Sequence, residues 1–214
     1  MIVKRVFDVL VAAIALMLAA PLLAVLAMAV WRADGRPILF QQTRPGMGGR
    51  PFTIYKFRTM RPGSTTEGDQ ARLTTFGRWL RRTSLDEIPE LWNVLRGNMS
   101  VVGPRPLLVD YVDRYDAFQA RRHEVRPGLT GWAQVHGRNA LDWDERFRLD
   151  VWYIDNRSFA LDVKIISMTI WTVLSGKGVS QPGHATMPEF KRLQAENSTV
   201  REESADVSQG DHHA

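Results

Sequence analysis

The sequence contains no cysteine among its 214 residues. This absence excludes disulfide bonds, thiolate metal ligands and thiol chemistry, and it gives no indication of redox compartment. Neither the P-loop motif nor the Gly-rich dinucleotide-binding motif is present. The internal histidines His123, His136 and His184 lie far apart without metal-ligand spacing, so we expect each to serve at the surface, and His212 and His213 lie in the C-terminal tail.

Charged residues are common, but basic residues outnumber acidic ones. The formal net charge is +5, with 44% hydrophobic and 24% charged residues, which is an ordinary globular composition. Most of the basic residues are arginine, whose planar fork of donors suits phosphate and carboxylate groups. The basic balance therefore suggests phosphate ligands, nucleic acid or an anionic membrane surface as partners.

One long stretch, from Val9 to Trp31, has no charged or strongly polar residue. As a single helix it would be about 34 Å long, which is enough to cross a bilayer core of about 30 Å. A cleaved signal peptide is one alternative, because Lys4 and Arg5 precede the run and small residues lie near its end. The run exceeds the usual apolar region of roughly 7–15 residues in signal peptides, so we favour a membrane anchor.

Pro21 divides this run into arms of about 18 and 17 Å, each close to the depth of one leaflet. Proline in a helix interior removes a hydrogen bond and clashes with the preceding turn. Basic residues flank both ends of the run, whereas a spanning helix usually has its positive charge on one side. The flanks therefore fit a re-entrant helix whose ends return to the same face, although these residues alone leave a kinked spanning helix open.

After the anchor, the pattern predicts an α+β domain that is mainly α. Alternating apolar residues around a Pro/Gly-rich centre predict a β-hairpin over residues 37–60. Helices are expected over 74–82 with Thr74 or Thr75 as the cap, over 89–98 with Pro89 in the first turn and Gly97 at the end, and over 107–125, 141–156 and 159–178. Residues 61–72, 100–106 and 126–139 are expected to form loops.

The helix expected at 159–178 has an apolar side formed by Leu161, Ile165, Met168 and Trp171. Such spacing most often marks a buried core face. In a membrane-anchored chain it would instead lie in the headgroup plane, with Trp171 at the interface.

The segment Arg81–Glu90, RRTSLDEIPE, places adjacent carboxylates, Asp86 and Glu87, after two arginines. One interpretation is a capping box, in which Ser84 caps a helix and Glu87 reaches back to the Ser84 N–H. The other is an active site, because a carboxylate at a helix start beside arginines stays ionised and can attack phosphorus. Carboxylates with substrate phosphates are also the usual ligands of Mg²⁺. The residues of this segment alone leave both interpretations open.

Five arginines lie in irregular segments that contain proline or glycine: Arg58, Arg81, Arg105, Arg126 and Arg138. Arg105 has proline on both sides, so it loses less entropy on binding and is a good candidate for a phosphate clamp. In the expected hairpin, alternation puts Lys56 and Arg58 on one face of their strand. A solvated edge strand, in which Lys and Arg are common, is the alternative there.

Three motifs together resemble the bacterial sugar transferases, and more specifically the small monotopic polyprenyl-phosphate phosphoglycosyl transferases. They are FQQTRPGMGGRPFTIYKFRTM, LRRTSLDEIPELWNVLRGNMSVVGPRPL and RPGLTGWAQVHGRN, and the resemblance runs from about Met1 to about Gly178. It implies transfer of a sugar 1-phosphate from a UDP-sugar to undecaprenyl phosphate, with release of UMP, by a ping-pong mechanism that needs Mg²⁺. Such a reaction begins the assembly of a membrane-bound glycan, such as an exopolysaccharide, O-antigen, capsule or glycoprotein glycan.

The resemblance also implies roles for individual residues. Asp86 would be the nucleophile on the sugar-bearing phosphate, and Glu87 would bind or orient the metal, with Asp86 as a further metal ligand. Pro21 would break a re-entrant membrane helix. The phosphate contacts would come from Lys56, Arg58, Arg81, Arg105 and Arg138.

The implied organisation is a re-entrant membrane helix over residues 1–35, a catalytic domain over 36–180 and a disordered tail over 195–214. The catalytic domain would lie on the cytoplasmic face of the bacterial inner membrane, with short and amphipathic helices packed at its surface. The UDP-sugar, undecaprenyl phosphate and membrane lipids are the expected partners. Nucleic acid is not expected, and a homodimer is left open.

Two positions depart from the family pattern. Ala20 precedes Pro21 where members often have serine, whose hydroxyl would bond a carbonyl freed by the helix break. His136 stands where asparagine is common before Gly-Arg-Asn. An alternative of another class is a non-catalytic membrane-surface protein that binds anionic lipid or nucleic acid through its arginines.

Overall fold

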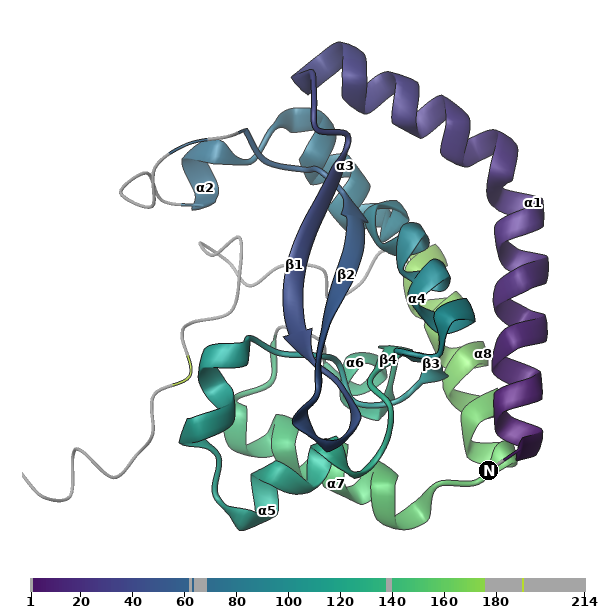
Figure 1. The fold of residues 1–214 in the computed structure, drawn as a ribbon, viewed down its shortest axis with the longest axis vertical. Helices are drawn as coiled ribbons and strands as arrows, with labels where there is room; N and C mark the ends of the chain where they lie inside the picture. Colours follow the sequence, from purple (N-terminus) through teal and green to yellow (C-terminus); the bar gives the residue numbers. More distant parts are fainter. Residues whose placement is uncertain (1, 62, 64–68, 138–139, 176–189, 191–214) are drawn as a thin grey trace, which may run out of the picture.

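The computed structural model describes residues 2–61, 63, 69–137, 140–175 and 190, and it is mainly helical with two small sheets (Figure 1). The expected tail over 195–214 lies outside these residues. The elements are α1 (Ile2–Asp34), β1 (Leu39–Pro45), η1 (Met47–Gly49), β2 (Pro51–Phe57), α2 (Asp69–Arg72), α3 (Thr75–Thr83), η2 (Leu85–Glu90), α4 (Leu91–Arg96), β3 (Ser100–Val102), η3 (Val109–Arg114), α5 (Ala117–Ala120), η4 (Arg121–Glu124), β4 (Gly128–Thr130), α6 (Trp132–His136), α7 (Trp143–Asn156) and α8 (Phe159–Ser175), where η denotes a 3₁₀ helix.

The predicted β-hairpin is confirmed. Strands β1 and β2 pair antiparallel from Leu39 opposite Phe57 to Pro45 opposite Pro51. Figure 1 shows the hairpin running from the α3 end of the molecule down to the helices of residues 109–156. It therefore connects the two halves of the domain, and β2 packs against η2, where the adjacent carboxylates lie.

Residues 100–106 and 126–139 were expected to be loops, and this prediction is partly wrong. Ser100–Val102 and Gly128–Thr130 form a parallel pair, β3 and β4, and α6 follows directly. A Cβ atom at Gly128 would lie 2.1 Å from the Gly103 backbone nitrogen, so glycine is needed for the two segments to approach this closely. Glycine indicated a loop in the sequence, but here it permits close backbone pairing.

The single helix expected over 107–125 is also wrong, because this segment forms three short pieces, η3, α5 and η4. Tyr115 has an extended backbone, and Asp116 starts a new helix. The Asp116 side chain accepts a hydrogen bond from the Gln119 backbone while the Gln119 side chain accepts one from Asp116, which is a capping box. The helical spacing of apolar residues concealed this internal start signal.

The other expected helices are confirmed, with small changes at their ends. Thr74 caps α3, Gly97 ends α4 with φ of 86°, and Asp142 caps α7. Pro89 lies in η2, so α4 starts later than expected, at Leu91.

The apolar side of α8 is divided between the core and the surface. Ile165 is fully buried, whereas Trp171 is 74% exposed. The prediction of a core face therefore holds at the start of α8, and Trp171 lies on the surface, where the interfacial alternative had placed it.

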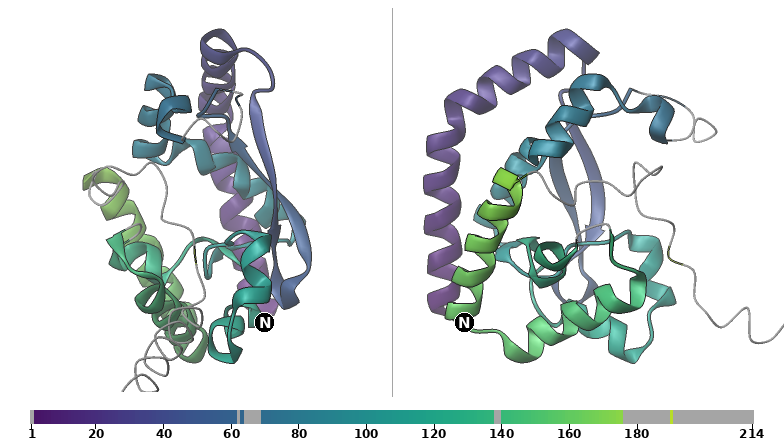
Figure 2. Two further views of the ribbon diagram at one scale, coloured as in Figure 1. Left: turned by 90° about the vertical axis from the view of Figure 1, so that its left-hand side faces the viewer. Right: turned by 180° about the vertical axis from the view of Figure 1, so that it is seen from behind.

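The N-terminal helix α1 extends over 33 residues with Pro21 in its interior. Figures 1 and 2 show it as a bent helix along one edge of the molecule, and the helix continues through Pro21 without interruption. A proline inside a helix is a common cause of such a bend. The buried residues of α1 lie near its two ends, at Asp8 and Ala12 and again at Leu26 and Val30.

Each end of α1 is attached to the same domain. Near the start, Ala12 joins a core cluster with Ile54, Val94 and Ile165. Near the end, Leu26 and Val30 pack with Phe57 and Leu80. Between these attachments the helix presents apolar side chains to the outside, namely Ile14, Met17, Leu18, Leu22 and Val25.

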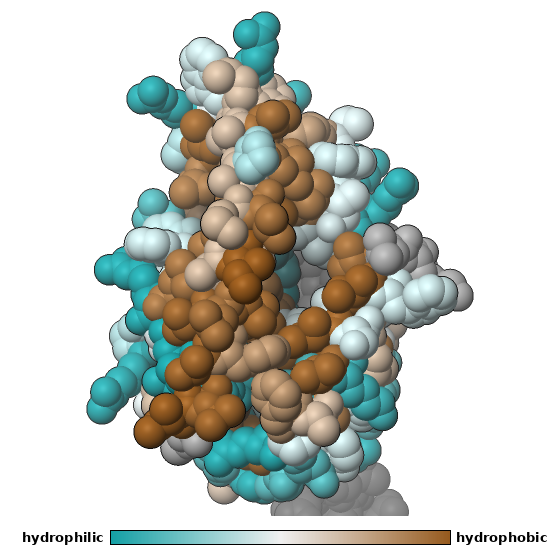
Figure 3. Space-filling model, turned by 90° about the vertical axis from the view of Figure 1, so that its right-hand side faces the viewer, coloured by the Kyte–Doolittle hydropathy of each residue, from teal (hydrophilic) through white to brown (hydrophobic). Residues whose placement is uncertain are grey.

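The exposed side of α1 forms a long hydrophobic strip on the surface (Figure 3). Within the described part of the chain, α1 is the one helix long and apolar enough to cross a membrane by length and composition. Helix α8 starts beside it, since the rings of Phe7 and Phe159 lie 5.0 Å apart, and it adds Val163, Ile170 and Trp171 as exposed apolar residues. A surface of this size and composition is typical of contact with lipid.

Candidate active site

The adjacent carboxylates lie at a sharp junction between two helices. Helix α3 ends at Ser84, whose φ of 57° is left-handed and whose backbone N–H bonds to the carbonyls of Leu80 and Arg81. The 3₁₀ helix η2 begins at the next residue and carries Asp86 and Glu87 in its first turn. The Ser84 side chain makes no capping hydrogen bond in this structure, so the capping-box interpretation is wrong.

The 3₁₀ geometry of η2 brings two glutamates to one side. A 3₁₀ helix has three residues per turn, so side chains at i and i+3 eclipse. Glu87 and Glu90 therefore both face Lys56 on β2, whose Nζ lies 2.9 Å from Glu87 Oε1 and 2.8 Å from Glu90 Oε1. Glu90 is almost completely buried, and burial raises its pKa. Glu90 was not predicted from the sequence, although its spacing of three from Glu87 was a usable signal.

Arg105 completes the cation pair around Glu87. Its Nη1 donates to Glu87 Oε2 at 3.1 Å, and its Nη2 donates to Glu87 Oε1. Burial opposes ionisation of Glu87, but the charges of Arg105 and Lys56 outweigh it and hold the pKa of this carboxyl well below its ordinary value. Glu87 is therefore an ionised group with both oxygens occupied.

Asp86 lies in a different electrostatic environment from its neighbour. It is 7% exposed, and its carboxylate accepts no hydrogen bond from the residues that the structure describes. Burial and the charge of Glu87 raise its pKa to about 6, against the opposing effect of Lys56, Arg81 and Arg105. A carboxylate that accepts no hydrogen bond within the described part of the chain, and that lies near three cations, is well suited to act as a nucleophile toward an anionic phosphate.

Arg81 is a third basic residue predicted from the sequence that lies close to the carboxylates. Arg81, at the end of α3, donates through Nε to Thr59 Oγ1 at 3.0 Å, and its charge acts on Asp86. A Cβ atom at Gly77 would lie only 1.9 Å from the Thr59 carbonyl oxygen, so glycine permits α3 to lie against this segment. The structure therefore brings Lys56, Arg81 and Arg105 to the carboxylates.

Arg58 does not join this cluster. Strand β2 ends at Phe57, and the Arg58 guanidinium donates instead to the backbone carbonyls of residues 34–36, at the end of α1. Arg126 likewise donates to the Gly97 carbonyl at 2.8 Å, at the end of α4. Both arginines cap helix ends. Arg138 lies outside the described residues.

Arg44 on β1 is a site residue that the sequence analysis missed. Burial and the nearby charge of Arg105 lower its pKa to about 10, and Glu90 acts in the opposite direction. Its Nε is buried without a hydrogen-bond partner among the described residues. Arg44 precedes Pro45 and Gly46, so the proline and glycine criterion used for the other arginines would have selected it.

The carboxylates of the site bear on whether it can hold Mg²⁺. No group of three or more His, Cys, Asp or Glu residues able to hold a metal is found within the described part of the chain. Mg²⁺ is usually held by one or two carboxylates together with substrate phosphates, so Asp86 and Glu87 suffice for a site that substrate completes. The pairing of Glu87 with Lys56 and Arg105 leaves Asp86 as the carboxylate with open coordination positions.

Comparison with known proteins identifies the family of this chain. A family model described as bacterial sugar transferase matches residues 1–176. A Bacillus subtilis protein named uncharacterized sugar transferase EpsL is 51% identical over 195 residues, which cover 89% of this chain and 96% of that protein.

Two further relatives carry more specific names. A UDP-N-acetylgalactosamine-undecaprenyl-phosphate N-acetylgalactosaminephosphotransferase of Aeromonas hydrophila is 43% identical over 82% of this chain and 44% of its own. The UDP-glucose:undecaprenyl-phosphate glucose-1-phosphate transferase of Escherichia coli K12 is 40% identical over 79% of this chain and 40% of its own. The chain thus spans nearly all of the first relative and less than half of these two.

Proposed function

The chain belongs to the bacterial sugar transferase family, and on this premise we propose that it transfers a sugar 1-phosphate from a UDP-sugar to undecaprenyl phosphate with release of UMP. The observation that carries the proposal is that the two adjacent carboxylates lie in different electrostatic environments. Glu87 is neutralised by Lys56 and Arg105, while Asp86 beside it accepts no hydrogen bond from the described residues. This reaction would be the first step in the assembly of a membrane-bound glycan.

The mechanism that the site supports has two displacements at phosphorus. In the first, an Asp86 oxygen attacks the sugar-bearing phosphorus of the donor, the bond from that phosphorus to the bridging oxygen breaks, and UMP leaves. The result is an acyl phosphate between Asp86 and the sugar. In the second, a phosphate oxygen of undecaprenyl phosphate attacks the same phosphorus, the bond to Asp86 breaks, and the carboxylate is restored.

The surrounding residues hold this geometry. Arg105 and Lys56 fix Glu87, and Arg81 favours the ionised form of Asp86. The cations also offset the repulsion between a carboxylate nucleophile and a diphosphate. Asp86 would hold Mg²⁺ together with the substrate phosphates, with Glu87 beside it to orient the ion, and the bound ion would neutralise charge on the diphosphate.

The attachment of α1 supports a re-entrant arrangement in the membrane. Near its start, the Arg5 guanidinium donates to the carbonyls of Val94 and Leu95 at 2.6 and 2.8 Å, and near its end Val30 packs in the same domain. A spanning helix would put these two ends on opposite sides of a bilayer. Both flanks are basic, so we place the domain on the cytoplasmic face of the bacterial inner membrane.

Release of UMP tests the reaction. The protein in vesicles with Mg²⁺ and undecaprenyl phosphate is incubated with a panel of UDP-sugars that starts with UDP-glucose and UDP-N-acetylgalactosamine. We expect UMP and a lipid diphosphate sugar from at least one donor. Absence of UMP across the panel would instead favour a non-catalytic membrane-surface protein.

Intact mass tests the covalent step separately. With donor and Mg²⁺ but no lipid acceptor, the protein should gain the mass of one phosphosugar, and peptide mapping should place it on Asp86. Turnover without any such adduct, even in rapidly quenched samples, would contradict the ping-pong mechanism.

Topology is testable because the chain has no native cysteine. Single cysteines introduced by Ile2→Cys and Phe40→Cys are labelled from either side of inverted and right-side-out vesicles. Labelling of both from the same side is expected. Labelling from opposite sides would show that α1 spans the membrane.

A further inference from the structure

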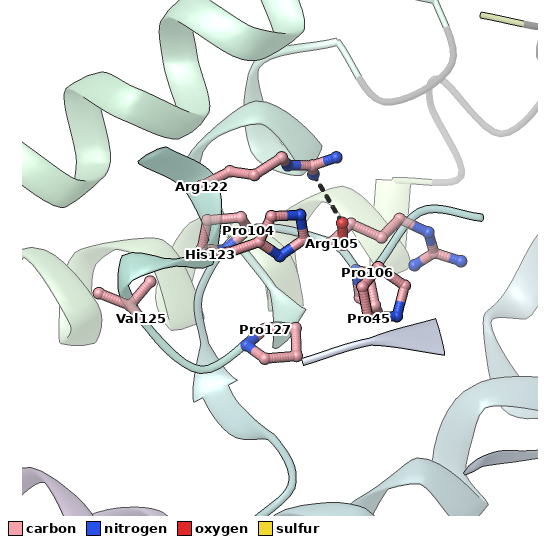
Figure 4. Close-up of a pocket in the computed structure, with 8 residues that line it drawn as sticks. All are labelled: Pro45, Pro104, Arg105, Pro106, Arg122, His123, Val125 and Pro127. Atoms are coloured by element: carbon pink, nitrogen blue, oxygen red, sulfur yellow. Dashed lines mark hydrogen bonds between the residues drawn. The ribbon is translucent and has the colours of Figure 1, made fainter. Parts of the chain in front are cut away.

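The loop that carries Arg105 has few backbone donors. Pro104 and Pro106 flank Arg105, and proline has no backbone N–H. Gly103 N donates to the Thr130 oxygen at 2.9 Å where the loop begins, and the next two residues are held through their carbonyl oxygens. Gly128 N donates to the Pro104 oxygen at 2.9 Å, and Arg122 Nη2 donates to the Arg105 oxygen at 2.7 Å, as Figure 4 shows for the second bond.

Arg122 is itself fixed on several sides. It is 3% exposed, and its Nη2 also donates to Asp150 Oδ2 at 2.8 Å, while its Nη1 donates to the Tyr115 hydroxyl at 3.2 Å. The guanidinium lies over the rings of Tyr115 and Phe147, at 5.8 and 5.4 Å from their centres. A planar guanidinium can serve these acceptors together, which the point charge of a lysine cannot do in the same geometry.

The buried ion pair of Arg122 and Asp150 is expected to contribute little to the folding stability of the protein. Arg122 and Asp150 have side chains only 2% exposed, and burying two charges costs several kcal/mol per ion that the pair must recover. Well-packed apolar residues of similar volume are often equally stable in such a position. The pair does supply a fixed hydrogen-bond donor to the Arg105 carbonyl, which apolar residues would not.

A small cavity of about 10 Å³ lies beside this donor, and its lining includes Pro45, Pro104, Pro106 and His123 (Figure 4). That volume is about one water molecule at most.

We propose that Arg122, held by Asp150, is a positioning residue that fixes the Arg105 backbone and through it the two-pronged contact of Arg105 with Glu87. This inference rests on the proposed function and extends it to residues outside the three sequence motifs. Misplacement of a positioned group by about 1 Å can cost about 100-fold in rate, so the effect on catalysis is expected to be large for residues that touch no substrate.

A double-mutant cycle tests the proposal. Arg122→Lys, Arg105→Ala and the double variant are compared by the single-turnover rate of UMP release without lipid acceptor. Arg122→Lys is expected to lower this rate about 10- to 100-fold in the native background and much less in the Arg105→Ala background. In the Arg105→Ala background the side chain that Arg122 positions against Glu87 is already absent. If Arg105→Ala is too slow to measure, Arg105→Lys serves as the second background.

The matched control is Arg121→Lys. Arg121 lies on the same 3₁₀ helix, but its ion pairs with Glu124 and Asp155 are exposed. The single-turnover rate of UMP release by Arg121→Lys should therefore equal that of the unaltered protein. Equal fold-losses from Arg122→Lys in both backgrounds, or native activity in Arg122→Lys, would overturn the proposal.

A second variant guards against misfolding. If Arg122→Lys does not fold, Asp150→Asn keeps the volume of the side chain and is expected to show the same coupling with Arg105 at smaller size. An additive effect of Asp150→Asn would equally overturn the proposal. Failure of the proposed function would appear differently, as absence of UMP release from the unaltered protein.

Discussion

Two lysines in this protein each bridge two carboxylates, and they do so in different ways. Lys56 lies 2.9 Å from Glu87 and 2.8 Å from Glu90 in the candidate active site. Lys4 lies 3.4 Å from Asp8 and 2.7 Å from Asp162, where the start of α1 meets α8. We call the second group the N-terminal clamp.

Each carboxylate of the N-terminal clamp accepts a hydrogen bond from a second donor besides Lys4. The Val101 backbone N–H donates to Asp8 at 3.1 Å, and the Tyr153 hydroxyl donates to Asp162 at 2.7 Å. Burial and the charge of Asp162 raise the pKa of Tyr153, so this hydroxyl remains a donor. The active-site cluster satisfies Glu87 but leaves Asp86 at its edge without such donors. The difference separates a cluster that joins elements from one that keeps a carboxylate available for chemistry.

Asp86→Asn should have the largest effect. Removal of a covalent nucleophile typically costs at least about 10⁴-fold in turnover, and the phosphosugar adduct should disappear. Since Asp86 is ionised against the effect of burial, the neutral amide should leave the melting temperature unchanged or higher. UMP release and thermal unfolding in detergent measure the two effects. Normal turnover in this variant would show that Asp86 is not the nucleophile.

Glu87→Gln should cost activity and some stability together. The change removes the charge that pairs with Lys56 and Arg105, so we expect turnover to fall by about 100-fold or more if the positioned cations are needed in the transition state. The unfolding free energy should fall by about 1–3 kcal/mol, as for the loss of hydrogen bonds to a charged group. Reduced stability with normal turnover would place Glu87 in the same class as the N-terminal clamp.

The rate of adduct formation should fall at acidic pH. Asp86 has a pKa of about 6, so the ionised fraction halves near that pH and falls about tenfold for each further unit. Because this pKa is raised above its ordinary value, ionisation of Asp86 weakens folding, and its contribution to stability is lost as pH rises from about 4 to about 6. Single-turnover rates between pH 5 and 8 test the first statement. A flat profile would contradict the assignment.

Asp162→Asn should have the smallest effect on turnover and act on stability alone. Asp162 is almost completely buried and binds Lys4 and Tyr153, so its loss should lower the unfolding free energy by about 1–3 kcal/mol. Turnover per folded molecule should be unchanged. Lys4→Met removes the other partner of this ion pair and should likewise act on stability alone. A strong loss of turnover in folded Asp162→Asn would show that the two clusters do not differ in role.

Much of the fold was predictable because its signals are local. Thr74 as a cap, Gly97 as a helix end and the alternation along the hairpin all act within a few residues. The pairing of β3 with β4 was not predictable, since it depends on a close approach at Gly128 that only the folded structure contains. The Asp116 capping box was visible in the sequence, but the helical spacing of apolar residues around it favoured one continuous helix in the prediction.

The candidate site was predictable in part. Adjacent carboxylates and the proline-bounded Arg105 gave direct signals. Arg58 was assigned to phosphate, but the strand ends one residue before it and its guanidinium caps α1. Arg122 and Asp150 gave no signal, because a buried pair 28 residues apart in the chain is defined only by tertiary structure.

The N-terminal clamp also bears on how the protein is made. Lys4 and Asp162 are separated by 158 residues, and chains grow at about 5–20 residues per second, so roughly 8–30 s pass between the synthesis of the two. Helix α1 leaves the ribosome long before its partner carboxylate exists. The other partners of the start of α1, namely Ile54, Val94 and Leu95, are made earlier, so the contact between Lys4 and Asp162 is among the last attachments of this end to become available.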